Sequence, residues 1–334
     1  MAFSPAPDHP AVPARSAGAV DAGSERRSGL LLGLGAYGMW GLLPLYFALL
    51  APAGPVEIVA VRVLWSVVFC VLLIAAGRQW RALGAVLRNR AAMLKLSLAA
   101  LLIAGNWLAF TFAVLAGHAL EASLGYFINP LIVVLLGVVF LKERLNRVQW
   151  TAMGIGLAAV LVLTFAYGAP PWIALILAGT FGLYGLVKKK VGTNVGALAG
   201  LTVETAALAP LAAVAMVWLG ATGAATAATH GPAHFWLLAA GGVITALPLI
   251  LFSGAARRLP LSVVGMLQYV APVMQFLLAL LVFHEEMPAE RWAGFGLIWV
   301  ALLLLSADMV RGVRASARPR RRRDSVTAGH APSA

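Results

Sequence analysis

The chain has 334 residues, of which 61% are hydrophobic and only 11% are charged. Soluble domains carry about 25% charged residues, and almost no stretch between residues 29 and 308 shows the polar face of a surface helix, so composition excludes an ordinary water-soluble domain. The net charge is +13, but the Lys and Arg residues stand in short connections between apolar runs and in the tail "RPRRRR". This placement is typical of a membrane protein rather than of a nucleic-acid-binding one.

Residues 1–28 are rich in Ala, Pro and Ser and lack the apolar core of a signal peptide, so we expect a disordered cytoplasmic tail. Apolar stretches of about 20 residues follow, which is the length that a helix needs to cross a bilayer. Pro, Gly or charged residues separate the stretches. The ten predicted spans cover residues 29–50, 56–77, 94–116, 119–140, 149–167, 171–187, 195–219, 234–254, 260–283 and 290–307.

Positive charges alternate along this series. Lys and Arg occur in both tails and in the connections after spans two, four, six and eight. The other connections contain none except the last, where Arg291 stands beside Glu285, Glu286 and Glu290. By the positive-inside rule, both termini are expected in the cytoplasm and the protein in the cell inner (plasma) membrane.

The sequence contains an internal repeat with an offset of 142 residues. Pro130 corresponds to Pro272 and Glu143 to Glu285, and Trp150 and Gly154 likewise correspond to Trp292 and Gly296. The first copy begins five spans before the second. Because five is an odd number, the two copies must lie upside down relative to each other, as in many secondary transporters. We expect an all-α integral membrane protein of two inverted five-helix repeats, residues 29–167 and 168–308, followed by a basic cytoplasmic tail, residues 309–334.

Two prolines, Pro130 and Pro272, fall near the middle of spans four and nine. A proline inside a helix removes one N–H donor and frees a carbonyl, which in lipid must find a partner or line a watered cavity. We predict helix breaks that border a midplane cavity. Kinks that only shape packing are the alternative.

Polar and aromatic side chains on several spans favour the cavity, because unpartnered amides are costly in hydrocarbon. Glu121, Gly125 and Asn129 share one face of span four, and Gln268, Pro272 and Gln275 share one face of span nine. Packing or interfacial anchoring is the alternative for each aromatic residue. The predicted substrate-binding residues are Asn106, Glu121, Tyr126, Asn129, Gln268, Tyr269, Gln275, Trp40 and Tyr184.

Arg62 and Glu204 are full charges inside spans two and seven, where charges are rare and are usually paired or functional. They are equivalent in the 142-residue repeat. We predict that they form a buried ion pair or bind a charged group of the substrate. Glu204 or Glu121 is also a candidate carrier of a coupling proton.

No catalytic or metal-binding constellation is visible, and no cofactor is expected. All Asp residues lie in the tails or at a helix end, and the His residues of the outer connections stand singly. Acid–base or metal chemistry needs such groups in clusters, which argues against a membrane-embedded transferase. A channel or a lipid-moving protein stays open beside a carrier.

The motifs "GAYGMWGLLPLYF", "EASLGYFINPLIVVLLGVVFLKERL", "TALPLILF" and "LQYVAPVMQFLLALLVF" closely resemble RarD proteins of the EamA branch of the drug/metabolite transporter superfamily. The resemblance covers residues 29 to 308. It implies ten helices in two inverted repeats, a central pocket, and a secondary carrier of small metabolites or drugs, with chloramphenicol or amino acids among the candidates. The expected partners are a small-molecule substrate, a coupling proton and membrane lipids, without nucleic acid; a homodimer stays open.

Overall fold

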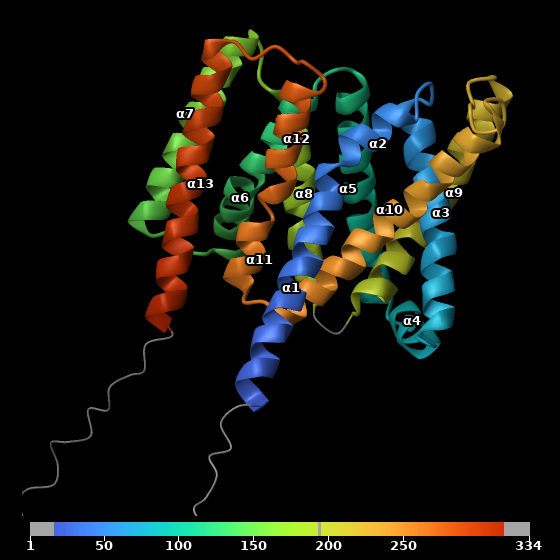
Figure 1. The fold of residues 1–334 in the computed structure, drawn as a ribbon, viewed down its shortest axis with the longest axis horizontal. Helices are drawn as coiled ribbons and strands as arrows, with labels where there is room; N and C mark the ends of the chain where they lie inside the picture. The colour runs from blue at the N-terminus through green and yellow to red at the C-terminus, as the bar shows by residue number, and fades with distance from the viewer. Residues whose placement is uncertain (1–16, 193–194, 317–334) are drawn as a thin grey trace, which may run out of the picture.

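The computed structural model describes residues 17–192 and 195–316, which fold into an all-α bundle (Figure 1). Within these residues, nine helices are long and apolar enough to cross a membrane, or ten if the bent pair Glu25–Gly41 and Leu43–Leu49 counts as one span. The prediction of an all-helical bundle with this number of spans is confirmed. The helices are α1 (Ala17–Gly41), α2 (Leu43–Leu49), α3 (Pro55–Ala76), α4 (Trp80–Arg88), α5 (Arg90–Leu115), α6 (Ala119–Leu141), α7 (Arg147–Tyr167), α8 (Trp172–Val191), α9 (Ala197–Ala221), α10 (Gly231–Arg258), α11 (Leu261–Leu267), α12 (Val270–Leu281) and α13 (Ala289–Ser316).

The first and last helices extend beyond the predicted spans. α1 begins at Ala17, so residues 17–28, which we assigned to the tail, are helical. α13 likewise continues to Ser316. Both extensions contain Ala and Arg, which favour helix, and neither contains Pro. The rest of the two predicted tails, residues 1–16 and 317–334, lies outside the described residues.

Two predicted spans are broken, but not symmetrically. α1 and α2 meet at Leu42 with a bend of 42°. Two residues, Gln268 and Tyr269, separate α11 from α12, although Val263–Leu281 still counts as one of the nine spans. Pro272 is the third residue of α12, next to this break. α6, by contrast, runs continuously through Pro130, so the break predicted there is wrong. Packing of α6 against both α8 and α12 supports the helix on either side of the missing N–H donor.

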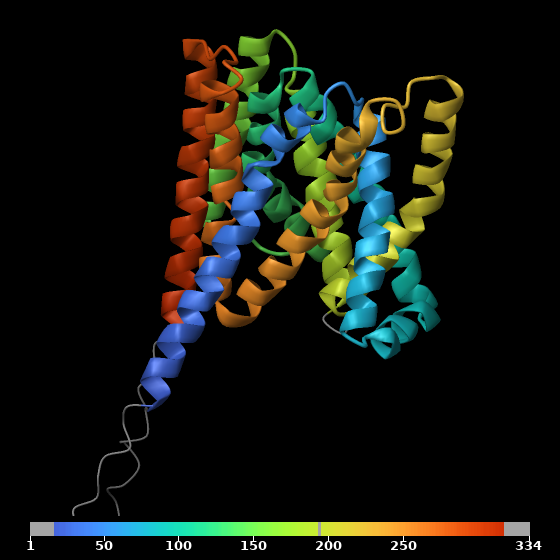
Figure 2. The ribbon, with the colours of Figure 1, turned by 45° about the vertical axis from the view of Figure 1, so that its right-hand side comes forward.

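The spans pack in antiparallel and crossed pairs (Figures 1 and 2). The main neighbours are α3 with α9, α3 with α10, α1 with α10, α5 with α8, α6 with α8, and α7 with α13. The contact between α3 and α10 is very close, since a Cβ atom on Gly242 would lie 2.5 Å from the backbone carbon of Trp65. Only glycine at position 242 allows the two helices to approach so closely.

Large apolar side chains remain exposed around the bundle, including Phe165 at 84% and Val217 at 73%. On a soluble protein such a surface would aggregate, but on a membrane protein it faces lipid tails. Smaller side chains fill much of the interior between the helices, where Ala36, Ala99, Ala152 and others are fully buried. Close helix contact and an apolar outer surface are what a bilayer requires.

Candidate functional site

Arg62, on α3, is only 3% exposed, and its guanidinium group lies inside the bundle. Its Nε donates a hydrogen bond to Thr245 Oγ1 on α10, and its Cζ lies 4.3 Å from the ring centroid of Trp107 on α5. Among the described residues, no acceptor reaches Nη1. A buried cation is stable only when its donors are satisfied, so Arg62 is prepared to bind an acceptor that the described residues do not supply.

Asn106 and Tyr126 form a network next to this arginine. The Asn106 amide nitrogen donates to Leu177 O and to Thr180 Oγ1, both at 3.0 Å. The Tyr126 hydroxyl donates to Asn106 Oδ1, also at 3.0 Å, and Tyr126 lies within electrostatic reach of Arg62. The structure therefore brings two predicted residues together, but the amide of Asn106 is engaged by α6 and α8 and positions the tyrosine.

Two further amide oxygens are buried without a partner among the described residues: Asn129 Oδ1 on α6 and Gln275 Oε1 on α12. Asn129 stands about one turn after Tyr126 on α6. Gln275 is 3% exposed, and its nitrogen donates to the carbonyl of Trp40 on α1 at 3.1 Å. Each amide thus presents an unused acceptor inside the bundle, where a desolvated carbonyl oxygen is costly.

The predicted face of span four exists, but it packs against α8. Glu121 accepts a hydrogen bond from Ile173 N at 2.9 Å, a Cβ on Gly125 would lie 2.9 Å from Ala174 O, and Asn129 Oδ1 would lie 3.7 Å from a Cβ on Gly182. Glu121 lies in the first turn of α6, about 12 Å along the helix from Asn129. The prediction that Glu121 lines a midplane cavity is therefore wrong, because its carboxylate caps the beginning of α8 at the end of the bundle.

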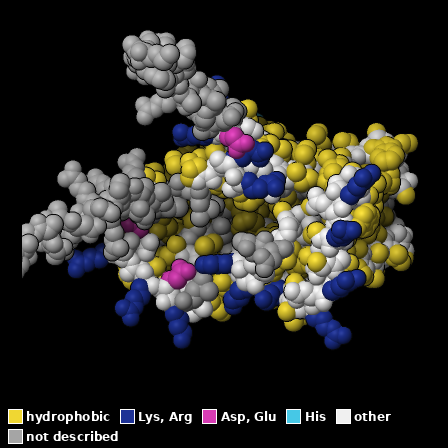
Figure 3. All heavy atoms as spheres, turned by 90° about the horizontal axis from the view of Figure 1, so that it is seen from below, with side chains coloured by type: hydrophobic (Ala, Val, Ile, Leu, Met, Phe, Trp, Pro, Cys, Tyr) yellow, Lys and Arg dark blue, Asp and Glu magenta, His cyan; other side chains and the backbone are white. Residues whose placement is uncertain are grey.

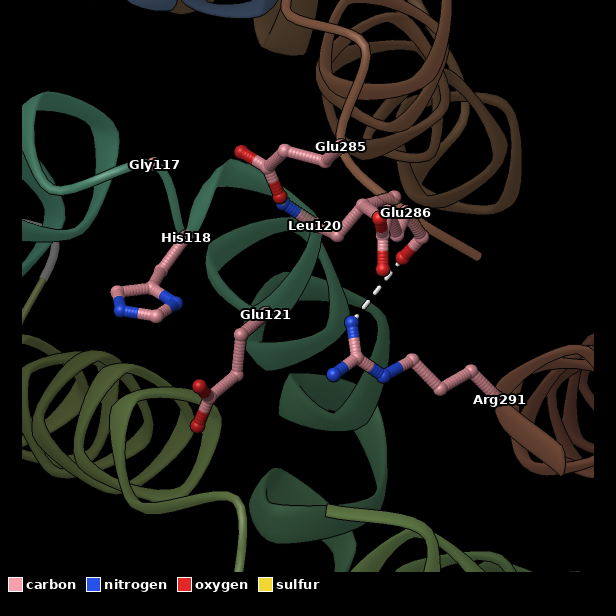
Figure 4. A pocket seen from close by; sticks show the side chains of 7 residues that line it. All are labelled: Gly117, His118, Leu120, Glu121, Glu285, Glu286 and Arg291. Atoms are coloured by element: carbon pink, nitrogen blue, oxygen red, sulfur yellow. Dashed lines mark hydrogen bonds between the residues drawn. The ribbon is translucent and has the colours of Figure 1, made fainter. Parts of the chain in front are cut away.

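Figure 4 shows this end of the bundle, where a small cavity of about 180 Å³ lies between α6 and the connection to α13. Glu285 Oε1 and Oε2 accept from Ala119 N at 2.6 Å and from Leu120 N at 2.8 Å. Burial raises the pKa of Glu285, although these two N–H donors, His118 and Arg291 lower it. The carboxylates of α6 and of the last connection thus tie together helices that are distant in the sequence.

Arg62 and Glu204 do not pair, so the first of the two predicted alternatives, a buried ion pair between them, is wrong. Binding of a charged group of the substrate stays a prediction. Glu204 pairs with Lys188 at the end of α8, and it accepts a hydrogen bond from the Tyr184 hydroxyl at 3.2 Å. Arg62 is the eighth residue of α3 and Glu204 the eighth of α9, and the two helices run antiparallel (Figures 1 and 2). Arg62 therefore lies about 10 Å from one end of the bundle, and Glu204 lies about 10 Å from the other end. In a hydrocarbon core about 30 Å thick, the two residues differ in depth by about 10 Å.

The remaining predicted residues have simpler environments. Gln268 and Tyr269, both half-buried, form the junction between α11 and α12. The ring of Trp40 contacts Tyr37 edge-on, with centroids 5.3 Å apart, and packs against Phe252. None of these contacts tests a role in binding, so that role stays a prediction.

Sequence reasoning missed Glu57 and Lys188. Glu57 is 1% exposed and accepts from Thr226 N at 2.7 Å, from Thr226 Oγ1 at 2.8 Å and from Ala227 N at 2.8 Å. Its position in "GPVE", an acid in the first turn of a helix, could have indicated a structural carboxylate. Lys188 was assigned to a connection because we ended that span at residue 187, whereas α8 continues to Val191.

The fold and the buried polar groups define a multi-pass membrane protein with a candidate binding site inside its helix bundle. Residues 27–165 match the EamA-like transporter family. The chain is 52% identical over 293 residues to protein RarD of Streptomyces exfoliatus, covering 88% of this chain and 92% of that protein. It is 41% identical over 286 residues to protein RarD of Escherichia coli, covering 86% and 96%.

A more distant relative, the chloramphenicol-sensitive protein RarD of Pseudomonas aeruginosa, is 37% identical over 300 residues, covering 87% of this chain and 97% of that protein. One solved crystal structure is similar with a TM-score of 0.53 and 22% identity, covering 84% of this chain and 97% of the other, and it shows the fold alone. The chain belongs to the EamA-like transporter family, as a relative of its RarD proteins. Its relatives are transporters rather than enzymes.

Proposed function

We propose that this chain is a secondary carrier that moves a small metabolite or drug across the inner membrane by alternating access. The observation that carries the proposal is Nη1 of Arg62, for which the described part of the chain offers no acceptor. The ring of Trp107 packs against the same guanidinium group, and Tyr126 interacts with it electrostatically. A charged side chain inside the membrane that has an unused hydrogen-bond donor is typical of a substrate pathway. The substrate class that fits this site has an acceptor for Arg62, such as a carboxylate or nitro group, and an apolar or aromatic body.

Asn129 and Gln275 extend the proposed site toward α12. Their unpartnered carbonyl oxygens accept hydrogen bonds, so they suit a substrate that also carries N–H or O–H donors. Gln275 donates a hydrogen bond to the Trp40 carbonyl, beside the bend between α1 and α2. A substrate that binds Gln275 therefore contacts a residue that is hydrogen-bonded to a broken span. Broken spans are common at the sites of secondary transporters.

Two inverted repeats, residues 29–167 and 168–308, remain part of the proposal. The helix contacts support them: α5 packs on α8 as α10 packs on α1, and α6 packs on α8 as α12 packs on α1. Equivalent helices also pair with each other, as in α3 with α9 and α7 with α13. This is the pattern that a pseudo-two-fold axis in the membrane plane produces.

Both termini are proposed to face the cytoplasm. The end of the bundle where α1 begins and α13 finishes carries the exposed Lys and Arg side chains of several connections (Figure 3). Positive charge gathers on the cytoplasmic side of membrane proteins. On this assignment, the cavity beside Glu121 and Glu285 opens at the outer end, and Lys188 lies at the inner end.

Glu204 is the proposed carrier of a coupling proton. It is 2% exposed and contacts Lys188 and Tyr184, so a proton that binds Glu204 competes with the ion pair and can loosen the contact between α8 and α9. Transport at the wild-type rate and with the wild-type pH dependence in Glu204→Gln would remove this role.

The experiment that tests the proposal is ligand-dependent thermal stabilisation of the purified protein with amino acids, nucleosides and chloramphenicol. Chloramphenicol is included because of the name of the Pseudomonas aeruginosa relative. Saturation at 100 times the dissociation constant stabilises a protein by about 2.7 kcal/mol. We expect a compound with an acceptor group to stabilise wild type and the exposed-arginine control Arg144→Gln, but not Arg62→Gln. Equal stabilisation of all three proteins contradicts the assignment of Arg62.

A further inference from the structure

The nine-residue helix α4 lies between the ends of α3 and α5, at the end of the bundle where Lys and Arg gather (Figures 1 and 3). Sequence reasoning treated its residues as a connection. Two fixed turns hold it in place. At its beginning, Arg78 has a φ of 50° and Gln79 N donates to Ile74 O at 2.9 Å. At its end, Asn89 Oδ1 accepts from Ala92 N at 3.0 Å and caps α5.

One face of α4 is attached to the protein. Leu83 and Val86 are 9% and 6% exposed, and they belong to a cluster that includes Ile74 on α3, Leu96 on α5 and Val203 on α9. Three spans therefore anchor this face, and α4 cannot turn without disrupting the cluster.

The other faces of α4 are open and divide into two stripes. Successive residues of an α-helix are about 100° apart, which places Arg81 and Arg88 on one stripe, about 180° from the midpoint of Leu83 and Val86. Trp80 and Leu87, each 52% exposed, form a second stripe between the arginines and the buried face. Arg78 and Arg90, which flank the helix, are exposed as well.

We propose that α4 binds the headgroups of anionic phospholipids in the leaflet at the basic end of the bundle. Trp80 and Leu87 enter the boundary between headgroups and acyl chains, where Trp is enriched in membrane proteins. Arg81 and Arg88 face the phosphates, and arginine binds these with two parallel hydrogen bonds. The membrane span α3 ends beside α4, and the membrane span α5 begins beside it. The two exposed stripes of α4 therefore lie at the surface of the bilayer.

The packing of α4 on α9 gives this lipid contact a structural consequence. Val203, in the buried cluster under α4, precedes Glu204 directly, and Ala199 belongs to the same cluster. A headgroup that holds α4 therefore holds the first turns of α9 as well. We expect anionic lipid to raise the stability of the whole protein.

The test uses the purified full-length protein in nanodiscs of phosphatidylcholine, with or without phosphatidylglycerol. The readouts are the phosphatidylglycerol retained, measured by native mass spectrometry after gentle release, and the midpoint of thermal unfolding. Each Arg near an anionic surface changes association about fivefold, so Arg81→Gln/Arg88→Gln should weaken retention about 25-fold and lose the lipid-dependent rise of the midpoint. The matched control is Arg144→Gln/Arg257→Gln, which removes two exposed arginines elsewhere at the same end.

Equal retention by the α4 variant and wild type overturns the proposal, and so does an equal loss in the control. A wild-type protein that shows no preference for phosphatidylglycerol over phosphatidylcholine also overturns the proposal. A second measurement does not depend on the arginine variants. The fluorescence of Trp80 is the difference between the spectra of wild type and Trp80→Phe. Lipids brominated near the headgroup should quench this Trp80 fluorescence. If they do not, Trp80 lies outside the bilayer and the proposal is wrong.

Discussion

Replacing Glu285 with Gln should loosen the beginning of α6. The carboxylate accepts two hydrogen bonds from backbone N–H groups, at 2.6 Å from Ala119 and 2.8 Å from Leu120. Hydrogen bonds to charged groups contribute about 1.5–3 kcal/mol each. Glu285 is half-buried, which favours the lower figure, and glutamine keeps one acceptor oxygen. The expected loss is about 1.5–2 kcal/mol, or about 10- to 30-fold in the equilibrium for opening this turn.

Hydrogen–deuterium exchange measures this opening directly, because the two amides are protected by the Glu285 side chain. We expect peptides that cover residues 117–124 to exchange about 10- to 30-fold faster in Glu285→Gln under mildly alkaline conditions. The matched control is Glu286→Gln, since the exposed Glu286 contacts Arg291 through its backbone carbonyl. Equal exchange in Glu285→Gln and Glu286→Gln would refute the reasoning that the Glu285 carboxylate holds the first turn of α6.

Three shorter predictions concern stability in micelles, measured by unfolding in sodium dodecyl sulfate. Lys188→Met leaves a buried carboxylate unpaired and should cost about 3 kcal/mol, the lower end of the range for such pairs, because Lys188 is 32% exposed; the exposed Lys189→Met should cost about 1 kcal/mol or less. Gly242→Ala should destabilise by about 1–3 kcal/mol through overpacking, whereas Gly38→Ala, with nothing within 4 Å of the new Cβ, should be neutral or stabilising. Since burial raises the pKa of Glu285, the pH-dependent part of its contribution to the free energy of unfolding is fully present below the ordinary carboxyl pKa and is lost as pH rises through the raised value. The two backbone hydrogen bonds of the ionised carboxylate remain above that pH. Glu285→Gln should remove that part of the pH profile, and an unchanged profile would contradict the shift.

The membrane spans could be predicted from the sequence because bilayer thickness fixes their length. The fourth predicted span, residues 119–140, differs from α6 by one residue. The short helix α4 could not be found by the same rule, since its apolar residues are too few to span a bilayer. The spacing of Trp80, Leu83 and Leu87 does follow a helical period, and this was the available signal.

The site was harder to predict, because a polar residue inside a span has several possible partners. Arg62 was correctly identified as a buried charge, and its partner Thr245 is 183 positions away. Arg62 and Glu204 occupy equivalent positions in the inverted repeat, and this equivalence suggested Glu204 as the partner of Arg62 instead. Inversion, however, places equivalent residues at mirror-image depths, so only residues at the midplane can meet. Glu121 shows the same difficulty, since its face was predicted correctly but its depth was not.

The most direct test of the central claim, a carrier whose substrate binds at Arg62, is counterflow in liposomes. Wild type, Arg62→Gln and Arg144→Gln are reconstituted with the radiolabelled compound that stabilises wild type most. The proposal predicts saturable uptake driven by unlabelled compound inside the liposomes for wild type and Arg144→Gln, and its loss in Arg62→Gln. Saturable counterflow by Arg62→Gln at the wild-type rate, or unsaturable flux through wild type, would contradict it.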